Sequence, residues 1–353
     1  MSIPYALLIT CETVTEHLPL ASGLSEHQSL TLFLAHLNLD HSRSDWNLYF
    51  QSIPESFNTM SMRFPLSLHQ LLPINVQSHI ARQLASLESD LEAILQRVSL
   101  DRELLTWAWM AVNTRCISLL SKTKTKPGAP TMALAPFLDL LNHSGSARIE
   151  TGIDLLSQSF FIKTLQRVNA NEQVFISYGP HDNAFLLCEY GFILDDNPYN
   201  YVAMDTEHVH QKLGKCTELE RILMENGIFG DYTLQEGEAS YRLLNAIRLG
   251  IVLKSDQKDQ DSELNAWKKV LSGEKECVSE TNEAQSKEIL QAVCQERLLE
   301  VKHALINLQN MAQRTTQSLL KEQISLCSRL RSQEQKTIVQ VLASLSCKPL
   351  ITH

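Results

Sequence analysis

The stretch LAPFLDLLNHSGS, residues 134–146, joins an apolar run to a group of polar side chains. The run is typical of a segment that enters a protein core, and its apolar members are Leu134, Phe137, Leu138, Leu140 and Leu141. It ends at Asn142 and His143. A histidine standing alone there is more often a hydrogen-bonded core residue than a ligand. An amide and an imidazole together, where the core stops, make the segment a candidate pocket wall.

The composition indicates a globular protein of two domains without a basic surface. A chain of 353 residues, 44% of them hydrophobic, is long enough to bury a substantial core. Its 31 lysine and arginine residues against 40 acidic residues give a net charge of −9, which lacks the basic excess of a nucleic-acid binder. We expect no direct contact with nucleic acid, whereas a lysine-rich protein tail is an electrostatically compatible partner.

The cysteines and the apolar segments indicate a soluble intracellular protein. No two cysteines form a C-x-x-C pair, so the sequence predicts neither a metal site nor a disulfide framework; the eight are Cys11, Cys116, Cys188, Cys216, Cys277, Cys294, Cys327 and Cys347. We expect reduced thiols, as in the cytoplasm and nucleus. The opening MSIPYALLIT has no basic residue, and no segment approaches the ~20 uncharged apolar residues of a membrane-spanning helix.

In the first two thirds of the chain, short strands flank a helical region. Helical periodicity predicts helices over 27–39, 76–98 and 101–120, separated by loops with prolines. Runs rich in β-branched and aromatic residues predict strands over 5–10, 159–165 and 172–179.

Beyond about Asp205 the sequence is almost entirely helical in period. A stripe at steps of three and four predicts helices packed within the chain, and it consists of Leu298, Val301, Leu305, Leu308 and Ala312. The charged stretches 253–267 and 272–288 are interpreted as solvated loops. We therefore expect an α+β fold with a boundary near residue 207.

Further polar residues stand at the ends of these elements. Arg115 closes the helical stretch WAWMAVNTR, Tyr178 ends a predicted strand, and Tyr190 follows twelve residues later. Taken singly, the arginine could pair with a surface carboxylate and the tyrosines could be ordinary buried aromatics. Their order and spacing, rather than any one of them, indicate a shared site.

That order resembles the SET-domain protein-lysine methyltransferases of the Rubisco large-subunit methyltransferase type. The resemblance covers nearly the whole chain and rests on WAWMAVNTR, APFLDLLNHS, EQVFISYGPHDN and EYGF. It implies a SET-domain β-fold over 1–207, with a helical insertion at 22–110 and a catalytic core at 111–195. It also implies an all-α C-terminal domain over 208–353 that serves substrate binding.

The resemblance implies a monomeric enzyme of the cytoplasm and nucleus that uses S-adenosylmethionine. Its protein substrate would carry the target lysine on a histone tail or elsewhere. Because the lysine amine has a reference pKa of about 10.4, it must lose a proton before it can accept the methyl group. Desolvation in an apolar channel favours the neutral amine, and positioning then carries most of the catalysis.

The family's site residues map onto this sequence by their motifs. The resemblance implies that the catalytic residues are Tyr178 and Tyr190. It implies cofactor contacts from Arg115, Thr114, Asp139, Asn142, His143, Tyr178 and Phe192. It implies a substrate channel lined by Ile117, Ile176, Tyr190 and Phe192. Asn183 would pack the intervening turn, and Gly179 and Gly191 would permit close backbone approach beside the tyrosines.

Three positions depart from the family pattern. We expect the glycine-rich G-x-G strand that wraps the cofactor to be missing, because MSIPYALLIT resembles the segment that follows it. Ile117 stands at a channel position that is aromatic in the Rubisco enzyme, and Asn171 replaces a glycine before Glu172. Asparagine tolerates the same left-handed turn. The alternatives left open are a catalytically silent SET-fold binding protein and a helical scaffold without methyl transfer.

Overall fold

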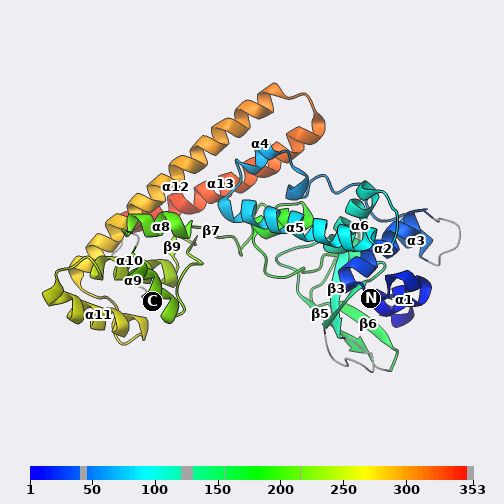
Figure 1. The fold of residues 1–353 in the computed structure, drawn as a ribbon, viewed down its shortest axis with the longest axis horizontal. Helices are drawn as coiled ribbons and strands as arrows, with labels where there is room; N and C mark the ends of the chain where they lie inside the picture. The colour runs from blue at the N-terminus through cyan, green and yellow to red at the C-terminus, as the bar shows by residue number, and fades with distance from the viewer. Residues whose placement is uncertain (40–45, 121–129, 155, 215, 348–353) are drawn as a thin grey trace. The chain divides into compact units, whose positions relative to one another are not determined.

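The computed structural model describes residues 1–39, 46–120, 130–154, 156–214 and 216–347. The chain divides into two compact units. The first contains Met1–Phe64 and Ser78–Pro198, and the second contains Pro65–Gln77 and Tyr199–His353. A short segment of the predicted insertion therefore belongs to the C-terminal unit. Figure 1 shows the helices and strands along the chain.

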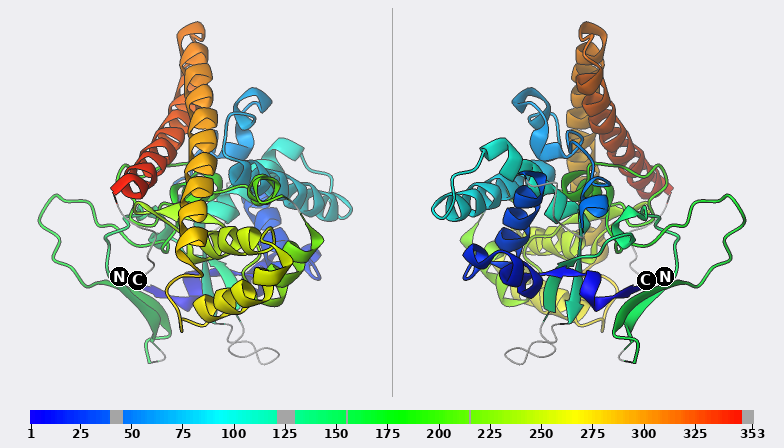
Figure 2. Two further views of the ribbon diagram at one scale, coloured as in Figure 1. Left: turned by 90° about the vertical axis from the view of Figure 1, so that its left-hand side faces the viewer. Right: turned by 90° about the vertical axis from the view of Figure 1, so that its right-hand side faces the viewer.

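The β-structure of the first unit forms two small antiparallel sheets within the described residues. One has the order β1-β6-β5, built from Ser2–Pro4, Ser159–Thr164 and Ile149–Asp154. The other has the order β2-β4-β3, built from Ile9–Thr10, Pro130–Leu134 and Cys116–Leu120. Strands β5 and β6 form the green hairpin of Figure 2. Apolar residues from both sheets and from the segments next to them, including Leu8, Leu138 and Phe160, share one core cluster.

Helices make up most of the rest of the first unit. These are α1 (Cys11–His17), α2 (Glu26–Leu39), α3 (Asn47–Phe50), α5 (Ile74–Leu95), α6 (Arg102–Arg115) and α7 (Asn183–Tyr190), with 3-10 turns η1 (Tyr5–Leu7), η2 (Pro19–Ala21), η3 (Ser61–Arg63) and η4 (Leu138–Leu140). Side-chain caps begin several of them; the Asp101 carboxylate, for example, accepts a hydrogen bond from Leu104 N in the first turn of α6. Helix α6 ends where β3 begins, which places Arg115 at a helix–strand junction.

The second unit is mainly helical. Its helices are α4 (Leu66–His69), α8 (Thr206–Lys212), α9 (Thr217–Glu225), α10 (Tyr241–Val252), α11 (Gln257–Leu271), α12 (Glu280–Arg314) and α13 (Ser318–Cys347). Helices α12 and α13 form the long orange and red hairpin of Figures 1 and 2. A small sheet, β7-β8-β9, joins Val202–Ala203, Thr233–Gln235 and Glu238–Ala239. Trp267 of α11 is fully buried in this unit's core.

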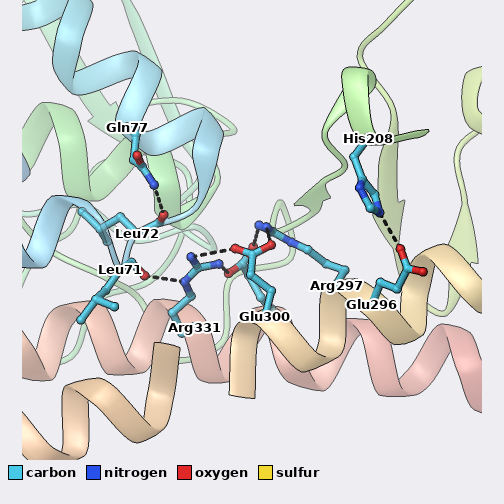
Figure 3. A network of polar contacts seen from close by, with 9 residues as sticks. Leu71, Leu72, Gln77, His208, Glu296, Arg297, Glu300 and Arg331 are labelled. Atoms are coloured by element: carbon cyan, nitrogen blue, oxygen red, sulfur yellow. Dashed lines mark hydrogen bonds and ion pairs between the residues drawn. The ribbon is translucent and has the colours of Figure 1, made fainter. Parts of the chain in front are cut away.

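A buried ion cluster links α12 and α13 to the segment 65–77. Arg331 Nη1 donates to Glu334 at 2.8 Å, and Arg297 Nη2 donates to the same carboxylate at 2.9 Å. Glu300 pairs with both arginines. Arg331 Nε also donates to the carbonyl of Leu71 at 2.7 Å (Figure 3). The Arg331 side chain is only 2% exposed, so this bond holds the segment against the helical hairpin from inside the unit.

The structure confirms the α+β class and the helical C-terminal region. Helices α2, α5 and α12 cover the stretches with strong apolar periodicity. The C-terminal unit also carries the small β7-β8-β9 sheet, which the helical period did not predict. Its stretch of chain begins at Tyr199, a few residues before the predicted boundary near 207. No helix in the described ranges is long and apolar enough to cross a membrane.

Four element predictions were wrong in part. The strand expected over 172–179 is reduced to one isolated bridge at Ile176, because its partner is the irregular segment around His143 rather than a strand. The strand expected over 5–10 is only Ile9–Thr10, preceded by η1. Helix 101–120 stops at Arg115, where β3 pairs with β4. The charged stretch 253–267 is mostly helical, since α11 buries Trp267, and the second half of the stretch 272–288 forms the start of α12, where Asn282 and Ser286 are buried.

Candidate active site

The two motifs that the sequence singled out meet through backbone pairing. Ile176 N donates to the carbonyl of Asn142 at 2.9 Å, and Ser144 N donates to the carbonyl of Ile176 at 2.9 Å. His143 thus lies in a parallel bridge with Ile176. Its Nδ1 accepts a hydrogen bond from the backbone N of Tyr178 at 3.0 Å. Segments 35 residues apart are therefore locked together at the end of the core run.

Three aromatic side chains gather next to His143. The ring of Tyr178 lies 4.9 Å from the ring of Tyr190 and 6.4 Å from that of Phe192. The rings of Tyr190 and Phe192 are 6.1 Å apart, and the His143 ring is 5.1 Å from Tyr178. All three aromatic residues are partly exposed. They form an aromatic wall that an apolar chain ending in a cation or amine could contact.

The two tyrosine hydroxyls remain protonated at neutral pH. Burial raises the pKa of Tyr190 to about 12, with the nearby charge of Glu189 adding to the shift. Burial also raises the pKa of Tyr178 above its usual 10.0. The Tyr178 hydroxyl donates to the carbonyl of Leu141 at 2.8 Å, which fixes its direction. Both residues can therefore align a reacting group and polarise it, but they do not supply a phenolate base.

The His143 side chain leaves one nitrogen available to a ligand. Because Nδ1 accepts from Tyr178 N, the neutral ring carries its proton on Nε2. Burial lowers the pKa of His143 below 6.5, which favours this neutral form. Nε2 is buried and has no hydrogen-bond partner among the residues that the structure describes. A buried donor without a partner is costly, so this atom fits an acceptor group of a bound molecule.

Arg115 belongs to a buried cluster with Asp139 and Tyr49. Arg115 Nη1 donates to the Asp139 carbonyl at 3.0 Å and to Oδ2 at 3.1 Å. The Tyr49 hydroxyl donates to the same Oδ2 at 2.7 Å. The Asp139 side chain is 1% exposed and that of Arg115 14%. Asp139 therefore orients Arg115 from the interior. Within the described ranges, the buried atoms Arg115 Nε and Asp139 Oδ1 have no hydrogen-bond partner.

The remaining predicted residues take different places. Asn142 is exposed, whereas the Thr114 hydroxyl bonds back to the Met110 carbonyl of its own helix at 2.9 Å. Ile176 belongs to a buried core cluster, and Ile117 and Tyr178 are partly buried and pack against it. Asn183 closes the turn as expected, since its side chain donates to Leu194 O at 2.7 Å and accepts from Leu194 N at 3.0 Å.

Backbone conformation agrees with the glycine and asparagine positions. Gly179 has φ +132°, Gly191 has φ +77° and Asn171 has φ +68°. A Cβ on Gly191 would lie 2.6 Å from Thr59 Oγ1, so the chain approaches closely beside Tyr190, as predicted. Asn171 occupies the left-handed turn that the sequence assigned to it.

Sequence reasoning missed Tyr49 and the acceptor role of the Leu141 carbonyl. Tyr49 lies 90 residues from its partner Asp139, and no local pattern marks such a contact. Among the described residues no group of three or more His, Cys, Asp or Glu side chains could hold a metal ion.

Comparisons with known proteins identify similar chains. The chain is 31% identical to SET domain-containing protein 4 of Mus musculus over 376 residues, which covers 98% of this chain and 81% of the relative. It is 29% identical to the ribosomal lysine N-methyltransferase set11 of Schizosaccharomyces pombe, covering 77% and 68% of the two chains. No protein-family model matches the chain.

A solved structure has the same fold. The SET domain of LSMT, determined with lysine and AdoHcy bound, aligns with a TM-score of 0.64 at 17% identity. The alignment covers 98% of this chain and 80% of that one.

Proposed function

The chain belongs to the SET-domain protein-lysine methyltransferases of the Rubisco large-subunit type, and from this premise we propose that it methylates protein lysines with S-adenosylmethionine as the donor. The observation that carries the proposal is the joining of the two motifs at His143. There a buried, unpartnered Nε2 lies beside the aromatic wall of Tyr178, Tyr190 and Phe192. A hydrogen-bonding group for a polar ligand thus adjoins a wall suited to an alkyl-ammonium chain.

The residues present fit the donor on the evidence of their unpartnered atoms. When bound, S-adenosylmethionine supplies a methyl group for in-line displacement by a neutral amine, with one proton released for each methyl transferred. His143 Nε2 and the exposed Asn142 amide would bind its acceptor groups. Arg115, oriented by Asp139, would face its carboxylate.

The aromatic residues act on the lysine and not on the donor alone. Partial burial between Tyr178 and Tyr190 desolvates an incoming ammonium group and so favours its neutral form. The fixed Tyr178 ring and hydroxyl would hold the amine for attack on the methyl group that the bound donor would supply. Ile117 and Ile176 would complete the apolar side of the channel.

We propose ribosomal proteins as the substrate class. The support is the relative set11, whose name describes a ribosomal lysine N-methyltransferase. The match covers 77% of the present chain. Histone tails are the competing class, and the net charge of −9 is compatible with either basic substrate.

Label transfer tests both the activity and the substrate class. The protein is incubated with labelled S-adenosylmethionine and either purified ribosomal subunits or core histones, and the labelled residue is identified by mass spectrometry. We expect label on lysine of a ribosomal protein, and on the order of 100-fold less with Tyr178→Phe. Label on histones alone would reject the ribosomal class, and label on neither would reject the substrate proposal.

A direct binding measurement separates the enzyme from the alternative of a catalytically silent binding protein. Calorimetric titration with S-adenosylmethionine should give saturable binding that Asn142→Ala weakens. A chain that shows no binding and no label transfer would instead support the binding-protein alternative.

A further inference from the structure

The residue before Tyr190 is a carboxylate held in the protein interior. Glu189 lies in the last turn of α7, and its side chain is 20% exposed. One oxygen pairs with Nε2 of His79 on α5. The other accepts a hydrogen bond from Nδ2 of Asn113 on α6 at 2.7 Å. Glu189 is therefore tied to two helices that arise far from it in the sequence.

The backbone on either side of Tyr190 is also fixed. Gln83 of α5 donates its side-chain amide to the carbonyl of Cys188 at 3.2 Å. After Tyr190, Gly191 turns the chain in the left-handed region, where a Cβ would lie 2.9 Å from Met60 N. The chain around Tyr190 thus has little freedom to shift, provided that these contacts remain.

Tyr190 itself lacks the anchor that Tyr178 has. The Tyr178 hydroxyl is directed by its bond to the Leu141 carbonyl. Within the described part of the chain, no protein hydrogen bond is found for the Tyr190 hydroxyl. The position of its ring against Tyr178, at 4.9 Å, must come from packing and from the backbone that carries it.

Glu189 is charged where it stands. Burial raises the pKa of its carboxyl, but hydrogen bonds from His79 and Asn113 outweigh burial and hold the pKa below its usual 4.5. Removing a partner from a partly buried, hydrogen-bonded carboxylate leaves its charge less well compensated, which makes Glu189 a firm anchor. Helix α7 is capped at its N-terminus by Asp182, so Glu189 is not needed to cap this helix.

We propose that Glu189 is a positioning residue that, through His79 and Asn113, fixes the Tyr190 ring against Tyr178 in the lysine channel. This inference rests on the proposed methyltransferase activity for its kinetic consequence, but its structural content is independent of that activity. Displacement of a positioned group by about 1 Å can cost on the order of 100-fold in rate.

The test compares three variants of the full-length protein. Glu189→Ala removes both contacts, Asn113→Ala removes one, and Glu189→Gln retains the shape and the hydrogen-bonding oxygen. The matched control is Glu88→Ala on α5, because the Glu88 carboxylate also bonds a side chain, Arg102, but is 55% exposed. Label transfer gives kcat and KM, and 13C-tyrosine NMR reports ring position. The chain has eight tyrosines, so the Tyr190 signal can be assigned by its loss in Tyr190→Phe.

We expect Glu189→Ala to shift the Tyr190 signal and to lower kcat by about 100-fold, while Glu189→Gln and Glu88→Ala stay within about threefold of the parent. Asn113→Ala should give a kcat and a Tyr190 signal between those of Glu189→Ala and the parent. If Glu189→Ala does not fold, Asn113→Ala tests the proposal in its place. An unchanged Tyr190 signal in the folded variants would overturn the proposal, whatever the rate does. Absence of label transfer by the parent would reject the proposed function, and the NMR comparison would still decide the role of Glu189.

Discussion

Asn142 and Arg115 carry the same expected role but sit in opposite environments. Asn142 is exposed, so Asn142→Ala should weaken S-adenosylmethionine binding without changing the free energy of unfolding. Arg115→Ala should weaken binding and also destabilise the fold, because it leaves the Asp139 carboxylate, 1% exposed, without its charge partner. We expect the free energy of unfolding to fall by about 3–5 kcal/mol. Calorimetry and urea unfolding measure the two effects. An equal loss of stability in both variants would contradict this separation.

The Tyr178 hydroxyl can be removed without changing the ring. Tyr178→Phe should lower methyl transfer by on the order of 100-fold, as expected when a hydroxyl oxygen that aligns the amine is lost, and stability by about 1 kcal/mol. Tyr241→Phe is the matched control, since that hydroxyl also donates to a backbone carbonyl, that of Leu271, at 2.7 Å. The control should lose similar stability and keep its activity. Full activity of Tyr178→Phe would remove Tyr178 from the reaction.

The buried His143 imidazole predicts a pH dependence of stability. Because burial lowers its pKa below 6.5, the unfolded chain takes up this proton at a higher pH than the folded protein. The contribution of His143 is therefore complete above pH 6.5 and is lost as the pH falls through the lowered value. Between pH 6.5 and the lowered pKa of His143, the free energy of unfolding measured in urea should fall more steeply with decreasing pH for the parent than for His143→Gln. Parallel curves would show that His143 titrates normally.

At the scale of elements, the end of α7 depends on a left-handed glycine. Gly191→Ala meets both backbone strain at φ +77° and Thr59 Oγ1 at 2.6 Å. Gly273→Ala meets only the strain, since its φ is +78° and nothing lies within 4 Å. We expect a cost of about 1 kcal/mol for Gly273→Ala and a clearly larger one for Gly191→Ala, measured by thermal unfolding. Equal costs would mean that the loop at Thr59 moves aside freely.

The elements that the sequence predicted well are those with a local signal. The apolar residues of α2 and the stripe of α12 follow the helical period. Most of α2 is buried. In the stripe, Val301 and Leu308 are buried and Leu298, Leu305 and Ala312 are partly buried. The stretch 172–179 has the composition of a strand, but a strand needs a partner, and only Ile176 finds one. In α11, residues 257–271, the buried face consists of a few apolar residues, Trp267 and Val270 among them. The many charged residues around them mask the helical period in the sequence.

The candidate site was predictable in its residues but not in its supports. Asn142, His143, Tyr178 and Tyr190 lie in short motifs, and the structure brings the motifs together. The groups that hold them, such as Tyr49 on Asp139 and His79 on Glu189, come from the helical insertion. Those contacts depend on how separate helices pack, which no single stretch of sequence records.

At the scale of the whole molecule, the chain passes between its two units at residues 64–65, 77–78 and 198–199. The segment 65–77 is flanked in sequence by Met60, which lies against Gly191, and by His79, which pairs with Glu189. Leu68 and Leu72 of this segment are fully buried. Arg331 of α13 thus bonds a segment whose neighbours in sequence lie close to Gly191 and to the Glu189 side chain.

Arg331 provides the test of that connection. Arg331→Met removes the bond to the Leu71 carbonyl (Figure 3). It also removes the positive charge that Arg331 places next to the Glu334 carboxylate, which is 7% exposed. We expect a loss of about 3–5 kcal/mol in the unfolding of the second unit and faster amide hydrogen exchange over residues 65–77. Lys212→Met is the matched control, because its pair with Glu296 is 41% and 39% exposed and such surface pairs contribute little. If exchange over 65–77 stays at the parent rate while α13 loses protection, the segment is held by its leucines alone and the Arg331 bond is dispensable.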